Sequence, residues 1–553
     1  MRSDFLTALA EKQRNSTQEV LAPRGNILFS DGTTLASTQP VFLIYAQPKI
    51  IQDKTQVAQT LAQTFWEDDH EGEVIEPDEK VSQEKTLQEN IFQTLSKDLF
   101  WVSLGRRANS EEKLKIEKKN LKGIGFETGS ARFYPEGSSS AHVLGFVGSD
   151  IYGSETGYFG LEGFYNGELK GKDGLLQQEQ DAQGVPILIG DFLVREPKPG
   201  KTLVLNIDRT IQHIVEDKLK QGLAKYSAKE ASAIVMDPKT GNILAMAAYP
   251  SYDPINPGKY PKENYKNPII ADNYEPGSTF KVLVMSAAIN EKLVTPDAIC
   301  DICAGPVSLG GFTIRTWNNQ YQPDSSMTDV IVHSDNTGMV FVSKKLGVNK
   351  MYQYIKNYGF GNLTNVDLQD EVSPNMRPLN DWREIDLATS SFGQGIAVTA
   401  MQMIKAVSAI ANGGQEMEPH IAKLIKDDNK SFPIQPRIVG NPISKETAQV
   451  ITEMMVKAVD KGEAQFYKKN AGLANFSIAG KTGTAQIPVA GHYDANKTIA
   501  SFIGFAPAKD PKFIMLVRYR EPQSSIFGAE TAAPTFFDIA KELFIYYGIS
   551  PQQ

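Results

Sequence analysis

A serine and a lysine stand one helical turn apart in the stretch YEPGSTFKVLVMSAA, at Ser278 and Lys281. A serine hydroxyl is a weak nucleophile near neutral pH and needs a base within hydrogen-bond reach. Residues three apart on a helix share a face, so this lysine can reach back over the serine. The Pro-Gly pair ahead of Ser278 predicts a chain break, and the apolar run behind it predicts a helix whose first N–H groups stabilise negative charge. The pattern indicates nucleophilic acyl chemistry at Ser278.

Ser-x-x-Lys does not identify a site by itself, because it recurs at Ser82 with Lys85 and at Ser110 with Lys113. Both recurrences lie in charged stretches, which are typical of solvent-facing chain. Neither follows a Pro-Gly break or precedes an apolar run. The context of Ser278 separates it from the other two, and a purely surface role for its lysine is the weaker interpretation.

Two further short motifs follow Ser278 in the chain, SDN at Ser334–Asn336 and KTG at Lys481–Gly483. Each has a look-alike, SPN at Ser373–Asn375 and an earlier KTG at Lys239–Gly241. The earlier KTG lies in a predicted hairpin turn and precedes the serine. The order of the set is more informative than any member, because these three motifs occur together in class A β-lactamases and penicillin-binding proteins.

Length and charge limit the possible functions. The chain has 553 residues, which predicts several domains. Its 57 basic and 65 acidic side chains leave a formal charge of −8, which offers no basic surface for nucleic acid. No apolar run approaches the roughly 18 residues that span a bilayer, and residues 1–20 lack the pattern of a signal peptide. We therefore expect no nucleic-acid partner and no membrane span within this sequence.

Metal and histidine chemistry are disfavoured. Cys300 and Cys303 lack a second cysteine pair or a nearby histidine pair, so they do not predict zinc. We interpret them as structural, either free or bridged, rather than catalytic. His333 precedes Ser334 without the Gly-x-Ser-x-Gly elbow of a hydrolase, and no His-Glu-x-x-His sequence is present. We therefore expect no metal and no cofactor.

A turn-rich junction divides the chain into two differently patterned parts. Pro197 and Gly200 lie between two apolar runs, which is typical of a domain boundary, here near residue 198. Residues 1–198 alternate short strands with glycine-rich turns and hold no catalytic constellation, so a scaffold or docking role is the better interpretation. Within them, the acidic residues 67–85 predict a solvated insertion or loop, and the polar residues 106–122 predict an exposed helix.

Residues 199–553 predict a mixed α/β domain with a largely antiparallel sheet. Asp208 is a predicted N-cap ahead of an apolar helical stripe, and Thr399 with Gln402 predicts a capping box ahead of a second helix. Two strand-turn-strand patterns and a final amphipathic helix are predicted at residues 232–250, 498–519 and 534–549.

The chain resembles the class B penicillin-binding proteins, the monofunctional peptidoglycan D,D-transpeptidases, over nearly its whole length. EPGSTFK from Glu275, SFGQGIAVTAMQM from Ser391 and GKTGTA from Gly480 are similar to the catalytic segments of that family. RGNILFSDGTTLAST from Arg24 is similar to its N-terminal segment. The form RFYPEGSSSAHVLGFVG from Arg132 favours the septal, cell-division branch over the elongation branch.

The resemblance implies a multidomain α/β architecture. A β-rich pedestal, similar to the family's dimerisation domain, would occupy residues 1–198. A penicillin-binding transpeptidase domain, with an antiparallel sheet flanked by helices, would occupy residues 199–553.

The resemblance also implies a role for each motif. Ser278 would attack the penultimate D-Ala carbonyl of a stem peptide, release the terminal D-Ala, and pass the acyl group to an amine on a neighbouring strand. Lys281 would be its base, helped by the positive charge of Lys481. Ser334 would relay a proton to the leaving amine, and Asn336 would hold the side amide of the acyl group.

The third motif is implied to hold the terminal carboxylate of the substrate. Lys481 and the hydroxyls of Thr482 and Thr484 would grip it, with Gly483 between the two threonines. The backbone N–H groups of Ser278 and Thr484 are the family's oxyanion pair. The strand that carries them would also offer an edge along which an extended peptide can lie.

The chain departs from the family pattern in three places. FSDG at Phe29–Gly32 replaces the usual Asp-Arg-Asn-Gly, so the pedestal contacts of that Asp-Arg pair are in doubt. Asp335 replaces the more usual middle serine of the second motif, a change expected to leave Ser334 and Asn336 in place. The family's N-terminal membrane helix is not found, so we expect that an anchoring segment is missing from this chain.

The resemblance implies a bacterial protein held at the cell membrane with its catalytic domain outside the cytoplasm. It implies β-lactam antibiotics as inhibitors and a membrane glycosyltransferase and divisome proteins as partners. Three other functions remain open: a β-lactamase, a penicillin-sensing receptor whose serine stays acylated, and a division scaffold without activity. A β-lactamase would leave about 200 N-terminal residues unexplained against the usual size of one domain, and the intact motifs argue against an inactive scaffold.

Overall fold

The computed structural model describes residues 15–70, 75–179, 193–428, 430–489 and 492–551. The chain forms two compact units, each described here by itself. The first comprises Met1–Asn26, Ala36–Phe133 and Lys170–Lys201, and the second comprises Ile27–Leu35, Tyr134–Leu169 and Thr202–Gln553. Residues 134–169 therefore belong with the larger unit, although they precede the turn-rich junction near residue 198.

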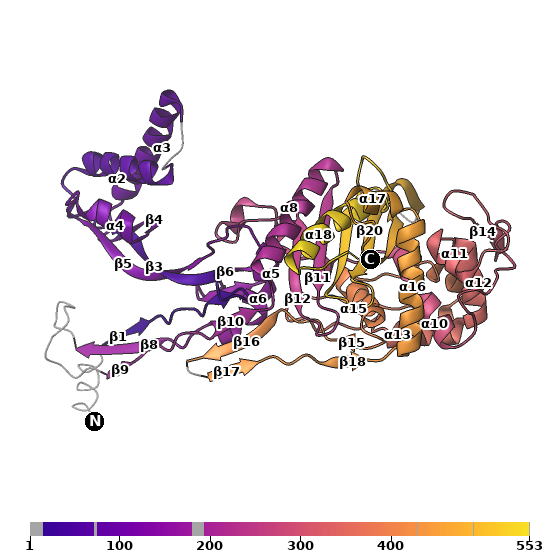
Figure 1. Ribbon diagram of the computed structural model, residues 1–553. Helices are drawn as coiled ribbons and strands as arrows, with labels where there is room; N and C mark the ends of the chain where they lie inside the picture. The colour runs from indigo at the N-terminus through magenta and orange to yellow at the C-terminus, as the bar shows by residue number, and fades with distance from the viewer. Residues whose placement is uncertain (1–14, 71–74, 180–192, 429, 490–491, 552–553) are drawn as a thin grey trace. The chain divides into compact units, whose positions relative to one another are not determined.

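The described residues of the first unit are rich in strands (Figure 1) and include the three helices α2, α3 and α4. Its strands are β1 (Asn15–Val20), most of β3 (Thr34–Ala46), β4 (Val102–Ala108), β5 (Ile124–Phe133), β8 (Gly174–Glu179) and β9 (Leu193–Arg195), and its helices are α2 (Lys54–Asp69), α3 (Pro77–Leu95) and α4 (Ser110–Glu117). β3 pairs antiparallel with both β4 and β5, and β8 pairs antiparallel with β1 and β9. Apolar side chains of α2, α3 and α4 pack with those of β3 and β4 into one small core.

The acidic residues 67–85, predicted to form a solvated loop, are mostly helical where the structure describes them. α3 begins at Pro77, a position where proline is tolerated because its missing N–H would have no partner. Two acidic residues follow in its first turn, where they complement the helix dipole. Trp66 of α2 donates its Nε1–H to the Gln83 amide of α3 at 3.0 Å. The loop prediction is wrong because a favourable helix start and the pairing of α3 with α2 outweigh composition. Residues 71–74 lie outside the described residues.

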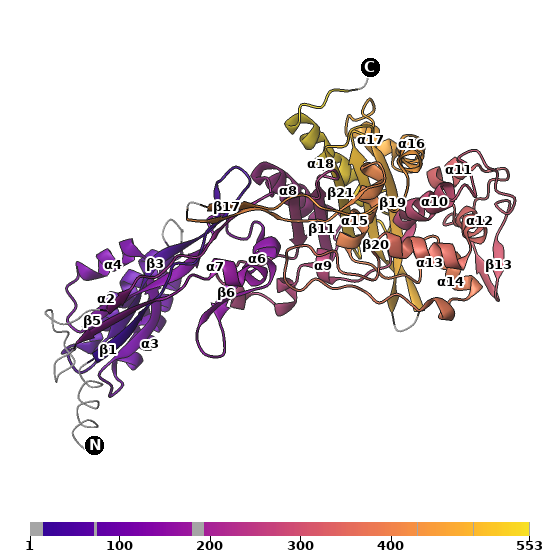
Figure 2. The ribbon, with the colours of Figure 1, turned by 90° about the horizontal axis from the view of Figure 1, so that it is seen from below.

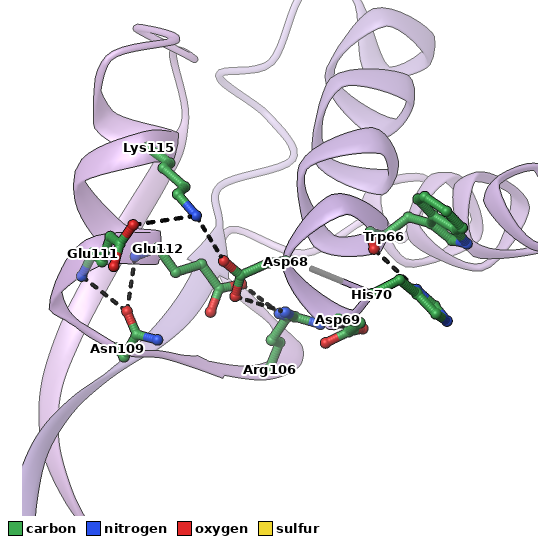
Figure 3. Close-up of polar contacts among 9 residues, drawn as sticks. All are labelled: Trp66, Asp68, Asp69, His70, Arg106, Asn109, Glu111, Glu112 and Lys115. Carbon is green, nitrogen blue, oxygen red and sulfur yellow. Dashed lines mark hydrogen bonds and ion pairs between the residues drawn. The ribbon is translucent and has the colours of Figure 1, made fainter. Parts of the chain in front are cut away.

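The polar residues 106–122 do not form one exposed helix as predicted. Arg106 belongs to β4, and α4 covers only Ser110–Glu117. The Asn109 side chain accepts the N–H groups of the two residues after Ser110 and so caps α4. Arg106 also bonds Glu112 of α4 at 2.5 Å, as Figure 3 shows. The segment is divided because its first residues pair with β3 as part of β4, after which Asn109 caps a new helix, and polar composition does not reveal this pairing.

A network of charged side chains joins three elements of the first unit (Figure 3). The Arg106 guanidinium lies 2.8 Å from Asp69 and 3.6 Å from Asp68, both at the end of α2. Lys115 of α4 bonds the same Asp68 at 3.1 Å. Glu112, on α4, is nearly fully buried in this network. The network therefore fixes α2, β4 and α4 against one another and has the features of a structural element.

The second unit contains many more elements. Its strands are β2 (Ile27–Leu28), β6 (Phe146–Ser149), β7 (Glu155–Tyr158), β10 (Thr202–Leu205), β11 (Glu230–Met236), β12 (Ile243–Tyr249), β13 (Val307–Leu309), β14 (Phe312–Ile314), β15 (Glu416–Met417), β16 (Ala422–Asp427), β17 (Lys430–Pro433), β18 (Ile438–Gly440), β19 (Ala479–Val489), β20 (His492–Ala506) and β21 (Phe513–Arg520). Its α-helices are α5 (Ala141–Leu144), α6 (Gly160–Phe164), α7 (Asn166–Leu169), α8 (Arg209–Lys225), α9 (Pro268–Ala271), α10 (Lys281–Asn290), α11 (Met327–Val332), α12 (Asn336–Leu346), α13 (Val348–Asn357), α14 (Glu384–Ser390), α15 (Ala400–Ala411), α16 (Lys445–Lys461), α17 (Gln465–Asn470) and α18 (Ala532–Tyr546), with short 3-10 turns η1 (Pro257–Lys259), η2 (Lys262–Tyr265), η3 (Gly277–Phe280) and η4 (Leu379–Asp381).

A five-stranded antiparallel sheet is the centre of this unit, in the order β12-β11-β21-β20-β19. Helices α8 and α18 pack on one face, where Phe502, Tyr519 and Phe536 are fully buried (Figure 1). Helices α9 and α15 contact the sheet through β11 and β21. Beyond β19, helices α10, α12 and α13 pack against one another (Figure 2). The sheet therefore ends at β19, next to a group of helices.

The local signals in the second unit predict its elements well. Asp208 accepts the N–H groups of the second and third residues of α8, and Thr399 forms the expected capping box with Gln402 ahead of α15. The three predicted patterns at 232–250, 498–519 and 534–549 correspond to β11–β12, β20–β21 and α18. The predicted fold class, an antiparallel sheet flanked by helices together with a β-rich N-terminal part, is confirmed. No helix within the described ranges is both long and apolar enough to span a bilayer.

Candidate active site

Ser278 lies in the 3-10 turn η3, which leads directly into α10. Gly277 ahead of it has φ +55°, a conformation that glycine adopts without steric cost. A Cβ at Gly393 would lie 2.2 Å from the carbonyl oxygen of Gly277, so both glycines are needed where these two loops meet. The Pro-Gly break read from the sequence therefore turns the chain sharply and leaves the Ser278 side chain partly exposed.

Ser334 lies in the turn between α11 and α12, with φ +55°. A left-handed backbone conformation is uncommon for serine, and such residues cluster at functional sites. Asp335, the next residue, is the N-cap of α12, and its side chain accepts the N–H of Thr337 at 2.7 Å. The structure accommodates the departure from Ser-Ser-Asn, because Asp335 caps the helix that Asn336 begins, a role that serine can also fill.

Lys281 is fully buried and bonds Ser334 in this turn and Asn336 at the start of α12. Its Nζ lies 2.6 Å from the Ser334 carbonyl oxygen, 2.8 Å from Asn336 Oδ1 and 3.3 Å from Ser334 Oγ. A neutral amine has two N–H donors and one lone pair. If the two shorter contacts take the N–H groups, the lone pair remains free to accept a hydroxyl proton.

The third motif lies on β19, the edge strand of the sheet. Lys481 is 3% exposed, and its Nζ bonds the carbonyl oxygen and the hydroxyl of Thr482, both at 3.2 Å. The Thr484 hydroxyl accepts the N–H of Gly528 at 3.0 Å. A Cβ at Gly483 would lie 2.8 Å from the Thr279 side chain, so a glycine is required where β19 passes η3. The strand and the turn that carries Ser278 are thus in direct contact.

One cavity of about 340 Å³ brings the predicted residues together. Five of them line it: Ser278, Ser334, Asn336, Thr482 and Thr484. Lys281 and Lys481 lie behind this lining as buried side chains that contact Ser334 and Thr482. Gly483 separates the two threonines on β19. All eight residues predicted from the sequence therefore belong to one site.

The two lysines have pKa values far below that of a free lysine. Burial and, next, the positive charge of Lys481 lower the pKa of Lys281 well below its usual range. Burial lowers the pKa of Lys481 to about 8, against the opposing effect of the Glu463 carboxylate. A lysine with a depressed pKa holds a larger neutral fraction near neutral pH and can act as a base. The site can therefore supply a proton acceptor beside a serine hydroxyl without histidine.

Sequence reasoning missed most of the remaining cavity lining. The missed residues are polar, aromatic or aliphatic side chains from several segments of the chain: Trp317, Phe392, Gln394, Glu463, Gln486, Thr498, Ile526 and Phe527. Phe392 and Gln394 lie in the stretch SFGQGIAVTAMQM, whose similarity to the family was the available signal. Gln486 lies two residues beyond Thr484 on β19, so the alternation of side chains along a strand was a second signal. The other positions carry no local pattern, because only the fold brings their segments to the cavity.

Cys300 and Cys303 are bridged rather than free. They form a disulfide whose Cα atoms are 5.6 Å apart, and both side chains are buried. The Cys300 N–H donates to the carbonyl oxygen of Ser325, and the Met327 N–H donates to Ala298. The bridged loop is therefore held against the start of α11, the helix that leads into Ser334.

Comparison with known proteins identifies the family. Residues 231–541 match the penicillin binding protein transpeptidase domain, and residues 19–205 match the penicillin-binding protein dimerisation domain. The chain belongs to the class B penicillin-binding proteins. The predicted family is thus confirmed, as is the predicted enzyme class of D,D-transpeptidase, since the matched catalytic domain is a transpeptidase domain that acts on peptidoglycan and binds β-lactams.

Individual relatives agree with this family over nearly the whole chain. The chain is 33% identical to the stage V sporulation protein D of Bacillus subtilis, covering 99% of this chain and 82% of that protein. It is 28% identical to the peptidoglycan D,D-transpeptidase FtsI of Escherichia coli, covering 96% and 85%. The crystal structure of penicillin binding protein 2X from Streptococcus thermophilus superposes with a TM-score of 0.76 at 26% identity, covering 97% of this chain and 83% of that one.

Proposed function

We propose that this penicillin-binding protein cross-links peptidoglycan stem peptides through an acyl-enzyme on Ser278. One observation carries the proposal most directly: the buried amine of Lys281 contacts Ser334 and Asn336 in the cavity that Ser278 lines. An amine with a lowered pKa at this place can take the serine proton.

In the first half-reaction, Ser278 Oγ forms a bond to the carbonyl carbon of the penultimate D-Ala. Its proton moves to neutral Lys281, and the peptide bond to the terminal D-Ala breaks. Ser334 Oγ, 3.3 Å from the Lys281 amine, passes a proton from that lysine to the leaving nitrogen. Backbone N–H groups of Ser278 and Thr484 stabilise the tetrahedral oxyanion, a role generally worth about 10²–10³ in rate.

In the second half-reaction, the nitrogen of an acceptor amine bonds to the acyl carbon and the bond to Ser278 Oγ breaks. Lys281 takes the proton that the attacking nitrogen loses, and the serine oxygen regains one. Asn336 holds the side amide of the acyl group, whereas Thr482, Thr484 and Lys481 hold the donor's terminal carboxylate only in the first half-reaction, until the terminal D-Ala leaves. Gly483 lets β19 approach the serine turn closely enough for this arrangement.

The same reaction explains β-lactam inhibition, because the strained amide of the drug acylates Ser278 without releasing a fragment that an acceptor can replace.

We propose a septal role, which the similarity to FtsI and to a sporulation protein supports. Divisome proteins and a membrane glycosyltransferase are then the proposed partners. A site outside the cytoplasm is supported by the disulfide, which persists in oxidising compartments.

Intact mass spectrometry after incubation with benzylpenicillin, followed over hours, tests the proposal. A transpeptidase gains one penicilloyl group and releases it slowly, and it transfers an acyl group from a D-alanyl thioester donor to an amine. Rapid loss of the adduct with penicilloate in solution would indicate a β-lactamase. A lasting adduct without any transfer from the thioester would indicate a penicillin-sensing receptor, and no adduct at all would contradict the site.

A further inference from the structure

One carboxylate lines the active-site cavity. Among the described residues that line it, Glu463 is the single ionisable side chain, and the others are hydroxyl, amide, glycine, aromatic or aliphatic. Glu463 is exposed and lies between α16 and α17. The charge that an approaching substrate meets at the cavity surface therefore comes from Glu463, while both lysines lie buried behind it.

The fold holds Glu463 at this place through the glycine before it. A Cβ at Gly462 would lie 2.7 Å from the carbonyl oxygen of Val332, the last residue of α11, and 2.4 Å from that of Ala458. The turn after α16 therefore packs tightly on the end of α11, two residues from Ser334. The result is a carboxylate beside both the Ser334 turn and β19.

Within the part of the chain that the structure describes, Glu463 makes one weak polar contact. The Thr482 hydroxyl lies 3.5 Å from its Oε2. Among the residues that the structure describes, no lysine or arginine nitrogen lies within 4.0 Å of this carboxylate. An exposed acid at the mouth of a site, with no cationic side chain in direct contact, is available to a cation on the substrate.

The acceptor of the second half-reaction brings a cation to the site. A primary alkyl amine has a pKa of about 10.4 and therefore arrives as an ammonium ion. Lys281 and Lys481 repel an ammonium ion to the extent that they are charged. When the terminal D-Ala leaves, the space beside Thr482 that its carboxylate filled becomes free, and Glu463 borders that space.

We propose that Glu463 is the residue that receives the ammonium group of the acceptor strand and so selects acceptors that carry a positive charge. The inference rests on the proposed transpeptidation. Glu463 binds the ammonium ion and takes no proton from it, so it lowers the KM for the acceptor without raising kcat. The amine that attacks is the neutral fraction in equilibrium with the bound ion.

The test compares two acceptors of the acyl-enzyme formed from an N-acyl-D-alanyl thioester. One is the amide of Nα-acetyl-lysine, which is cationic, and the other is hydroxylamine, which is mainly neutral near neutral pH. We expect Glu463→Gln to raise the KM for the lysine derivative roughly twofold to fivefold, the usual range for an exposed ion pair. The KM for hydroxylamine should not change, and added salt should narrow the difference between the two acceptors.

Two variants serve as controls. Glu463→Asp keeps the charge and should retain most of the preference for the cationic acceptor. Glu453→Gln removes an exposed charge from α16, the helix that ends two residues before Glu463; Glu453 does not line the cavity, and this variant should change neither KM. An equal change in KM for both acceptors with Glu463→Gln, or no change for either, would overturn the inference. Transfer by the unmodified protein would still support the proposed transpeptidase function. Failure of the unmodified protein to transfer to any amine would instead overturn the proposed function and this inference with it.

Discussion

Two Ser-x-x-Lys sequences begin helices in this molecule, one at Ser110 and one at Ser278. At the first, Ser110 is exposed, and Lys113 pairs with Glu117 one turn further along α4 at 3.6 Å. At the second, Lys281 is fully buried and contacts the turn between α11 and α12. Equal spacing therefore gives a solvated ion pair in one place and, in the other, a buried lysine that contacts Ser334 in the cavity that Ser278 lines.

The two Lys-Thr-Gly sequences differ in the same way. Lys239 and Thr240 lie in the turn between β11 and β12, where both bond the Asp237 carboxylate through the Lys239 N–H and the Thr240 hydroxyl. Lys481 and Thr482 lie on the edge strand β19, next to the serine turn. Burial and neighbours, rather than residue type, decide which copy lines a cavity. Each of the following predictions changes one copy and uses the other as its control.

The largest expected effect is that of the nucleophile. Ser278→Ala should abolish covalent labelling by penicillin, because no other group in the cavity is expected to form the acyl bond. Folding should be kept, since a change of one partly exposed hydroxyl generally costs within about 0.5 kcal/mol. Peptide mapping of the adduct and the melting temperature measure the two effects. Ser110→Ala should change neither, and an adduct on any residue other than Ser278 would refute the mechanism.

Removal of the base should have the next largest effect. Lys281→Met keeps the length of the side chain but supplies no proton acceptor, so the acylation rate constant should fall by roughly 10²–10⁴. Stopped-flow measurement with a fluorescent penicillin gives this rate. Lys113→Met in α4 should leave it unchanged. A rate within about tenfold of the unmodified protein would exclude Lys281 as the base.

The hydroxyl of the third motif should contribute less, and in a way that depends on ligand charge. Thr482→Val should slow acylation by an anionic penicillin about tenfold more than acylation by its neutral methyl ester, because a hydrogen bond to a charged group contributes about 1.5–3 kcal/mol. The ratio of the two rates removes any general damage to the site. Thr240→Val should lower stability by about 1 kcal/mol through the lost bond to Asp237 and leave the ratio unchanged. Equal slowing of acid and ester would contradict the carboxylate role.

The smallest expected effect is a shift in pH dependence. Acylation should rise with pH as Lys281 loses its proton, and fall above about pH 8 as Lys481 loses the charge that holds the carboxylate. Lys481→Met removes a positive charge that lowers the pKa of Lys281, so that pKa should rise and the ascending limb should move to higher pH. The ascending limb is measured as the acylation rate constant for a neutral penicillin ester over a range of pH. Lys239→Met should not move it, and a fixed ascending limb in Lys481→Met would show that the two lysines do not interact.

Local sequence signals predicted the elements that carry the site, because caps and periodic apolar residues act within one helix or hairpin. Asp208 and Thr399 cap the helices they were predicted to cap, and the hairpins at β11–β12 and β20–β21 lie where turn chemistry predicts them. The family motifs predicted the chemistry of Ser278. The same reasoning failed for residues 67–85, where packing of α3 on α2 outweighs an acidic composition.

By itself, the sequence determined which side chains are available for acyl transfer and which helices and strands carry them, since both follow from residue types over short spans. The fold alone decided that Lys281 meets Ser334 in a left-handed turn, that Lys481 is close enough to lower the pKa of Lys281, and that Glu463 faces the cavity. These relations join segments far apart in the chain. Charge interactions and desolvation depend on distance in space and on the exclusion of water, and neither quantity exists until the sheet and helices have packed.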